Sequence, residues 1–318
     1  MSRTSGSAAP AWPVLDYASW RDTCETLLLW SQIVGKVRLA QSPWLNHSWQ
    51  APLYVTARGL GTSLVPHGSR AFDIEFDFQD QRLRLRTSDG GVRDIALEPM
   101  SIAAFHRQVL DALSGLRVPV AIHGAPNEVA VAVPFAEDHA ARAYDPEPVG
   151  RFWRALVQAH RVLSLFRTEF IGKASPVHFF WGSFDLAVTR FSGRTAPPHP
   201  GGVPHLPDAV AREAYSHEVS SAGFWPGGGA IDFPAFYSYA YPEPPGYRTA
   251  TARPAQASFN TALGEFILPY EAVRSAPDPD AALMDFLVST YEAAADNAGW
   301  DRRALECAPG VPGKPRPV

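Results

Sequence analysis

The sequence predicts an α+β fold made of two similar halves, each with antiparallel strands packed against long helices. Long stretches carry apolar residues at helical spacing, shorter stretches alternate apolar and polar residues as strands do, and one series of short motifs occurs twice. A chain of 318 residues exceeds the usual single-domain size of roughly 100 to 150 residues. It therefore has room for two such halves.

Composition and charge narrow the class of protein. Hydrophobic residues make up 46% and charged residues 19% of the chain, values typical of a globular protein. A formal net charge of −4 provides no basic surface, so we expect neither a nucleic acid nor a membrane as partner. Two isolated cysteines and the lack of an apolar signal segment favour a reducing cytoplasm. The oligomeric state stays open.

The first half is expected to begin with a helix over residues 16–39, followed by a strand at 52–58. FDIEFDF (72–78) and RLRLRT (82–87) alternate apolar and charged residues and predict an antiparallel hairpin. Its acids, Glu75 among them, would face its arginines on a solvated surface. Residues 101–113 predict a closing helix.

The second half is expected to repeat this plan after two short strands and a linker. The strands are predicted at 118–122 and 128–134, and the linker at 135–148. A long helix over 149–170 has a broad apolar stripe. A strand at 184–189, a loop rich in Pro and Gly at 195–208 and a strand at 214–221 follow. The remaining predicted elements are strands within 235–241 and 263–273 and a helix at 278–297.

The order of motifs in the two halves predicts an internal duplication. Trp-Arg, Gly-Lys, Ser-Pro, His, Trp and Val-Thr occur in this order between residues 20 and 56, and again between 153 and 189. We therefore divide the chain into a disordered N-terminus (1–12), a first half (13–134), the linker (135–148), a second half (149–303) and a disordered, Pro-rich tail (304–318). Two fused copies would pack about a pseudo-twofold axis, where pockets are common.

A candidate site lies in the stretch from Gly172 to Arg194, which is dense in aromatic, small and ionisable residues. In a strand over 184–189 the large side chains enter the core, and Asp185 faces the opposite side beside small neighbours. A buried carboxylate needs a cation, a proton or water. Either Asp185 pairs with an arginine such as Arg190 or Arg194, or it lies at the centre of a pocket.

The pocket interpretation gives the protein a catalytic centre made of His178, Asp185 and His217, closed by the turn at 224–227. These three residues could transfer protons, or hold a divalent metal ion if one is bound. The other residues expected to line the pocket are His47, Lys173, Trp181, Arg190, Tyr215, Glu218 and Trp225. A non-catalytic protein that binds a small molecule, or a structural protein, is the alternative.

No motif in the chain identifies a reaction or a cofactor. The sequence has no GxSxG, HExxH, CxxC or GxGxxG motif, and its GGG turn lacks the Lys and Ser or Thr of a phosphate-binding loop. The cofactor and the substrate are therefore not predicted from the sequence.

Several longer motifs resemble those of one bacterial family. They are IVGKVRLA, PLYVTARGL, SPVHFFWGSFDLAVTRFSGR, AYSHEVSSAGFWPGGG and STYEAAAD. Together they are similar to the domain of unknown function 5996 family, and the resemblance extends from about Trp12 to Glu306. It implies no established activity and transfers no catalytic residue to this chain.

Overall fold

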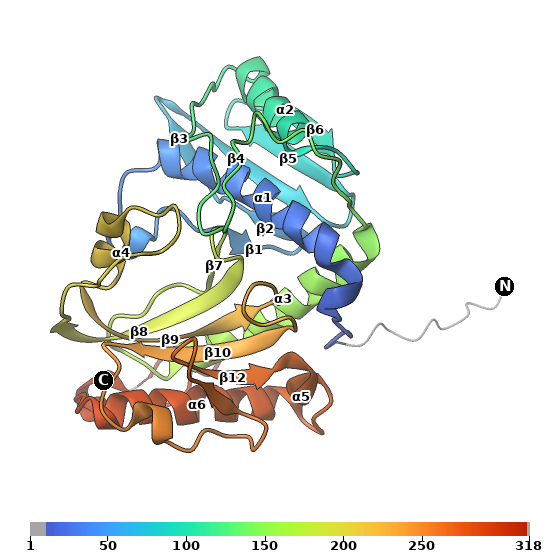
Figure 1. Ribbon diagram of the computed structural model, residues 1–318. Helices are drawn as coiled ribbons and strands as arrows, with labels where there is room; N and C mark the ends of the chain where they lie inside the picture. The colour runs from blue at the N-terminus through green and yellow to red at the C-terminus, as the bar shows by residue number, and fades with distance from the viewer. Residues whose placement is uncertain (1–10, 317–318) are drawn as a thin grey trace.

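The computed structural model describes residues 11–316 and has two antiparallel sheets of six strands, each packed against helices (Figure 1). The first sheet has the strand order β1-β2-β4-β5-β6, with β3 also paired to β4. The second has the order β11-β12-β10-β9-β8-β7. The α+β class is therefore confirmed.

The first half begins with the long helix α1, which lies across the first sheet (Figure 1). Its elements are α1 (Tyr17–Gln41), the 3-10 turn η1 (Asn46–Ser48), β1 (Tyr54–Val55), β2 (Gly59–Gly61), β3 (Val65–His67), β4 (Arg70–Asp77), β5 (Arg82–Thr87), β6 (Val92–Ala96) and α2 (Ile102–Gly115). Trp30 of α1 is fully buried and stacks on Phe105 of α2 with ring centroids 4.5 Å apart. The helix passes through Gly35 without a break. Glycine suits this position because a side chain there would overlap the ring of Trp181.

The predicted hairpin is confirmed, but the exposure of its charges is not. β4 and β5 pair antiparallel with Glu75 opposite Arg84, in the expected register. Glu75 is nevertheless only 8% exposed and Asp77 is fully buried. The segment after β1 covers them, because Thr56 donates to Glu75 at 2.8 Å and Arg58 contacts Asp77 at 2.5 Å. The expectation of a solvated face was wrong here because this cover comes from residues outside the hairpin.

Replacing Glu75 with Gln should consequently lower the free energy of unfolding by about 1 kcal/mol, because the charge-assisted bond from Arg86 is lost. Urea unfolding measures the change. Glu137→Gln, at an exposed position, is the matched control and should have no effect. Equal stability of the two variants would contradict the buried position of Glu75.

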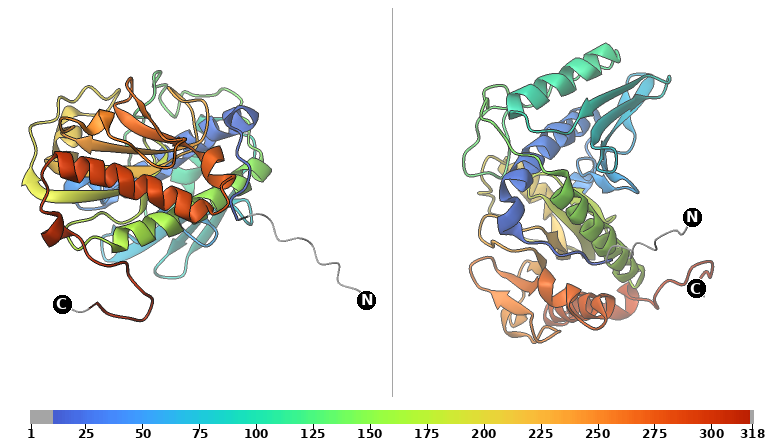
Figure 2. Two further views of the ribbon diagram at one scale, coloured as in Figure 1. Left: turned by 90° about the horizontal axis from the view of Figure 1, so that it is seen from below. Right: turned by 90° about the vertical axis from the view of Figure 1, so that its right-hand side faces the viewer.

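The second half places the helices α3 and α6 together on one face of its sheet (Figure 2). Its elements are α3 (Pro146–Thr168), β7 (His178–Phe180), β8 (Asp185–Thr195), α4 (Asp208–Ala214), β9 (His217–Trp225), β10 (Ala235–Tyr241), the 3-10 turn η2 (Tyr247–Thr249), β11 (Ser258–Asn260), β12 (Glu265–Pro269), α5 (Tyr270–Arg274), α6 (Pro279–Asn297) and α7 (Arg302–Leu305). Asp145 caps α3 by accepting from the backbone N–H of Glu147 at 3.0 Å.

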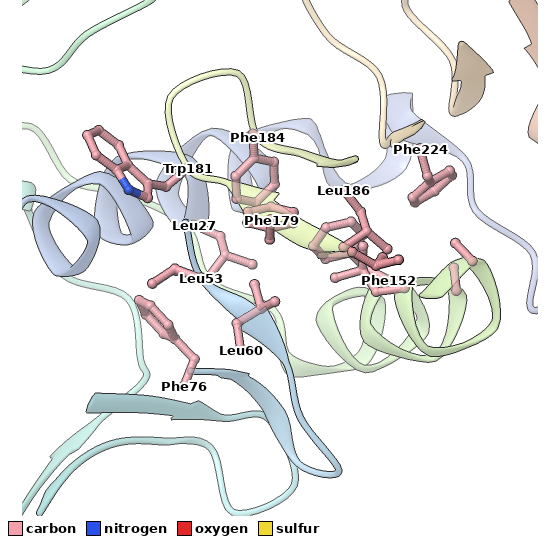
Figure 3. Close-up of a cluster of buried hydrophobic side chains, with 14 of the residues drawn as sticks. Leu27, Leu53, Leu60, Phe76, Phe152, Phe179, Trp181, Phe184, Leu186 and Phe224 are labelled. Carbon is pink, nitrogen blue, oxygen red and sulfur yellow. The ribbon is translucent and has the colours of Figure 1, made fainter. Parts of the chain in front are cut away.

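One continuous core joins the two halves. Phe152 of α3 packs against Phe184 and Phe179, with ring centroids 5.5 and 6.3 Å apart, and leucines of the first half lie beside them (Figure 3). Leu53 and Phe179 also exchange backbone hydrogen bonds of 2.8 and 2.7 Å. Full burial of each such side chain contributes about 1.5 to 3 kcal/mol, so this shared core fixes how the halves meet.

Several predicted strands differ in the structure. Residues 118–122 and 128–134 form no strand, and 52–58 contributes only the two residues of β1. The strand predicted at 214–221 is the end of α4 followed by β9. Apolar alternation in 128–134 indicated a strand, but the segment pairs with none, and the backbone N–H of Glu128 instead donates to the carbonyl oxygen of Pro204.

The chain ends pack more than expected. Trp12 is 7% exposed and donates to Asp280 at 3.3 Å, whereas residues 1–10 of the predicted disordered N-terminus lie outside the described residues. In the segment 304–318, which was predicted to be a disordered tail, residues 304 and 305 end α7, and Gly310 donates to Thr168 at 2.9 Å. Residues 317 and 318 are likewise outside the described part. No helix within residues 11–316 has the length and apolar character needed to cross a membrane.

Candidate functional site

A cavity of about 570 Å³ lies between the first half and the uncovered face of the second sheet. Its walls come from the C-terminal part of α1, η1, the loop at 123–128, and strands β7 to β10, and the segment 203–215 covers it. Among the residues that line it are Lys36, Trp44, His47, Trp49, Asn127, Glu128, Phe180, Trp181, Gly182, Ser183, Asp185, Ala187, Thr189, Tyr215, Tyr237 and Tyr239. Aromatic rings and a few converging polar groups are typical of small-molecule sites.

Asp185 lies on the cavity face of β8, as the alternation of this strand predicts. Ala187 and Thr189 follow it along the same wall. Ser183 donates to one of its carboxylate oxygens and Tyr237 of β10 donates to the other. Burial raises the pKa of Asp185, and these two hydrogen bonds oppose the rise. The carboxylate is thus held in one orientation at the cavity wall.

Glu128 is a second carboxylate in the same cavity. It lies against Gly182, where even a methyl group would overlap its carboxylate. The Glu128 side chain is exposed where it lines the cavity. The protein packed around it and the neighbouring charge of Asp185 raise its pKa to about 7. The backbone at Glu128 has φ 58°, an uncommon value for this residue type, and its N–H donates to Pro204 at 2.9 Å.

Lys36 brings a cation to this wall from α1. It is 4% exposed, donates to the side-chain oxygen of Asn127, and lies 5.5 Å from the ring of Trp181. Gln32, one turn earlier, exchanges hydrogen bonds of 2.8 Å with the backbone of Asn127 and so fixes the loop. Burial lowers the pKa of Lys36 to about 8, opposed by the charge of Glu128. Lys36 and Glu128 therefore titrate close to neutral pH.

His47 also lines the cavity, and its ring is fixed by two contacts. Nδ1 lies 2.9 Å from the carbonyl oxygen of Ala214 and Nε2 lies 2.5 Å from Nζ of Lys173, so the neutral ring donates through Nδ1 and accepts at Nε2. Burial is the largest of the effects that lower its pKa, and the Lys173 charge adds to it. Lys173 itself touches His47 without lining the cavity.

His178 is not part of the cavity, which corrects the predicted catalytic centre. It is fully buried on β7 among the rings of Trp49, Tyr54 and Phe180, and neither ring nitrogen has a hydrogen-bond partner among residues 11–316. Burial and the charges of Arg38 and Arg167 lower its pKa to about 3. Its ring is therefore neutral and enclosed, unsuited to exchange protons with a ligand.

His217 is not in the cavity wall either. Its ring lies 6.0 Å from that of His47, and its Nδ1 is 3.1 Å from the hydroxyl of Ser216. No histidine in the described chain hydrogen-bonds to Asp185, whose partners are Ser183 and Tyr237. The predicted His–Asp centre is thus not assembled.

Three of the predicted pocket residues face elsewhere. Arg190 lies on the core face of β8 with its guanidinium 3.5 Å from the ring centre of Phe166. Glu218 pairs with Arg194 at 2.7 Å, and Trp225 packs on a small separate cluster, so the turn at 224–227 does not close the cavity. These positions also contradict pairing of Asp185 with Arg190 or Arg194. His47, Trp181 and Tyr215 do line the cavity.

The three residues named for a metal ion do not form a metal site. Across residues 11–316, no group of three or more His, Cys, Asp or Glu side chains is placed to hold an ion. Neither His178 nor His217 lines the cavity, and neither hydrogen-bonds to Asp185.

Glu128 and Tyr237 were not predicted as site residues. Glu128 was assigned to a strand that does not form. The one available signal was the alternation in AFYSYAY, which places Tyr237 and Tyr239 on a single face of β10.

Comparison with known proteins gives one match. The chain fits the model of a family of unknown function, DUF5996, over residues 12–307. No curated protein and no solved structure matches it significantly. Because the family match spans nearly all of its length, this chain belongs to the DUF5996 family.

Proposed function

We propose that this protein is an enzyme that transfers protons to or from a small organic molecule bound in the cavity. The observation that carries the proposal is the Asp185 carboxylate, oriented by Tyr237 and Ser183 beside Glu128 and Lys36. A cavity of about 570 Å³ accommodates a small metabolite. The acid–base centre is thus built from carboxylates and a lysine, in place of the histidines that the sequence suggested.

Each group has a chemical role that follows from its surroundings. The pKa of Glu128, raised to about 7, lets its carboxyl group give or take a proton at neutral pH. Asp185, held by two hydroxyl donors, can accept a proton from a ligand with little reorganisation. Lys36, with its pKa lowered to about 8, can stabilise negative charge that develops on the ligand. Tyr237 acts through Asp185 as a positioning residue.

The proposal can be tested without knowing the substrate. The purified protein is incubated with an extract of bacterial small metabolites, and mass spectrometry follows which compounds disappear. We expect a compound that is consumed only in the presence of the folded protein. Hydrogen–deuterium exchange should then show that this compound protects amides of β8 and α4, which border the cavity. No consumption, or protection elsewhere only, would contradict the proposal.

A non-catalytic binding protein is the second candidate. It is favoured by the aromatic part of the wall, where Trp44, Trp49 and Phe180 offer apolar surface without acid–base groups. In that case a metabolite should protect the same amides but be recovered unchanged. The two candidates therefore differ in whether the bound compound is chemically altered.

We also propose that the two halves descend from one duplicated unit. Residues at matching places in the two halves make crossed contacts: Lys36 lies 5.5 Å from the ring of Trp181, and Lys173 lies 5.4 Å from the ring of Trp49. A pseudo-twofold axis produces such reciprocal pairs. Superposition of α1 with the first sheet onto α3 with the second tests this. If Lys36 and Lys173 then fall at unrelated positions, the duplication is wrong.

The cytoplasm stays the proposed location. Cys24 is buried and Cys307 is partly buried, and both are free thiols. Free thiols persist in a reducing compartment. Fractionation of a native host, with detection of the protein in the soluble cytoplasmic fraction, would test this placement.

A further inference from the structure

The unpaired carboxylate of Glu128 indicates what the cavity binds. Among residues 11–316 it accepts no hydrogen bond, and its charged neighbours are Asp185 and, beyond ion-pair distance, Lys36. By contrast, both oxygens of Asp185 accept from hydroxyl groups, and Lys36 donates to Asn127. Glu128 is thus the charged group on this wall that has no partner of its own, and it faces the cavity.

The balance of charge in the cavity is negative. Two carboxylates line it, from Asp185 and Glu128, against the single ammonium group of Lys36 in the described wall. Behind the wall, Glu265 lies close enough to interact with Asp185 and Lys173 contacts His47, so these two groups add one charge of each sign and leave the excess unchanged. His47, with its lowered pKa, contributes no positive charge at neutral pH. A ligand that brings a positive charge would neutralise this excess, and an anionic ligand would add to it.

The apolar part of the wall also suits a cation. Trp49, Phe180 and Trp181 line the cavity together with Tyr215 and Tyr237, so a bound molecule meets several aromatic rings. Aromatic faces attract ammonium groups and also pack against apolar rings. The two features together specify a molecule with a positive end and an apolar body.

We infer that the ligand of this cavity is an organic amine with an apolar, ring-sized body, whose ammonium group pairs with Glu128. This inference rests on the proposed function, because it names the class of molecule that would occupy the same cavity. The close contact between Glu128 and Gly182 holds the carboxylate beside the turn that leads into β8. The ammonium group is thereby placed next to Asp185, the proposed proton acceptor.

Three probes that share one ring test the inference. Tryptamine carries an ammonium group, tryptophol a neutral hydroxyl group and indole-3-acetate a carboxylate, and isothermal titration calorimetry compares their binding. We expect tryptamine to bind at least about tenfold more tightly than tryptophol, as a charge-assisted bond to a carboxylate implies, and indole-3-acetate to bind least. Glu128→Gln should bring tryptamine and tryptophol to within about twofold of each other.

A second variant tests whether Glu128→Gln acts only by disturbing the structure. Gly182→Ala keeps the Glu128 charge but displaces its carboxylate, so it should also reduce the preference for tryptamine. Glu137→Gln, on the surface, should leave the preference unchanged. Thermal denaturation confirms that each variant is folded.

The remaining outcomes are informative about the inference and the proposed function separately. Tryptophol binding as tightly as tryptamine, or tighter binding of indole-3-acetate, would overturn the inference while leaving a cavity that binds small molecules. No binding of any probe up to about 10 mM would also overturn it, since an amine matched to such a site should reach at least millimolar affinity. The metabolite experiment would then still decide whether the cavity is catalytic.

Discussion

Replacing Asp185 with Asn should lower the turnover of the metabolite identified as substrate by at least about 100-fold, the usual effect of removing a general base. The amide keeps the shape of the carboxylate but cannot take a proton. It also cannot accept at both of its ends, so the bonds from Ser183 and Tyr237 cannot both persist. The protein should stay folded, because burial of a neutral amide costs less than burial of a carboxylate.

The measurement is a comparison of kcat/KM for the two proteins, with thermal denaturation as the test of folding. Asp111→Asn is the matched control, because it makes the same chemical change at an exposed position on α2 that does not line the cavity. Tyr237→Phe provides a graded intermediate, because it removes one donor to Asp185 and leaves the carboxylate in place. Full turnover by Asp185→Asn would remove Asp185 from the mechanism.

Local patterns in the sequence were sufficient to predict the helices and strands that bury an apolar face. The alternation over 184–189 placed Asp185 on the face opposite the core, and the structure confirms it. The complementary charges over 72–78 and 82–87 predicted both the hairpin and its register. In these cases the period of the side chains decides the structure, and the period can be counted in the sequence.

Which residues line the cavity could not be predicted in the same way, because this depends on contacts between segments that are distant in the sequence. Glu128 reaches Gly182 from a loop without helix or strand, held in place by hydrogen bonds between Gln32 and Asn127. His178 and Asp185 lie seven positions apart and share a sheet face, yet His178 is outside the cavity wall, next to the ring of Trp49, which belongs to that wall. No local period encodes which ring from another part of the chain fills a given space.

The burial of His178 predicts an effect on the stability of the protein. His178→Phe should remove a destabilisation at acidic pH that the wild-type protein suffers. The pKa of His178 is about 3 in the folded protein, against 6.5 for an unperturbed histidine. Above pH 6.5 the ring is neutral in both the folded and the unfolded chain, so it adds no pH dependence. Below 6.5 the unfolded chain binds a proton that the folded chain cannot bind until about pH 3, and unfolding becomes more favourable as pH falls.

Between pH 7 and pH 4.5 this effect lowers the free energy of unfolding by about 2 to 3 kcal/mol in the wild-type protein. Phenylalanine has no such proton to bind, and its ring suits a site bounded by Trp49, Tyr54 and Phe180. At pH 7 the variant should be at least as stable as the wild type, because two unpaired ring nitrogens are removed from the interior.

Urea unfolding at both pH values yields the difference in the free energy of unfolding between the two proteins, in which the effects of all other titrating groups cancel. His139→Phe, at an exposed position, should show no such pH-dependent difference. If the stability difference between wild type and His178→Phe is the same at both pH values, His178 is protonated in the folded protein and its enclosure by these rings is wrong.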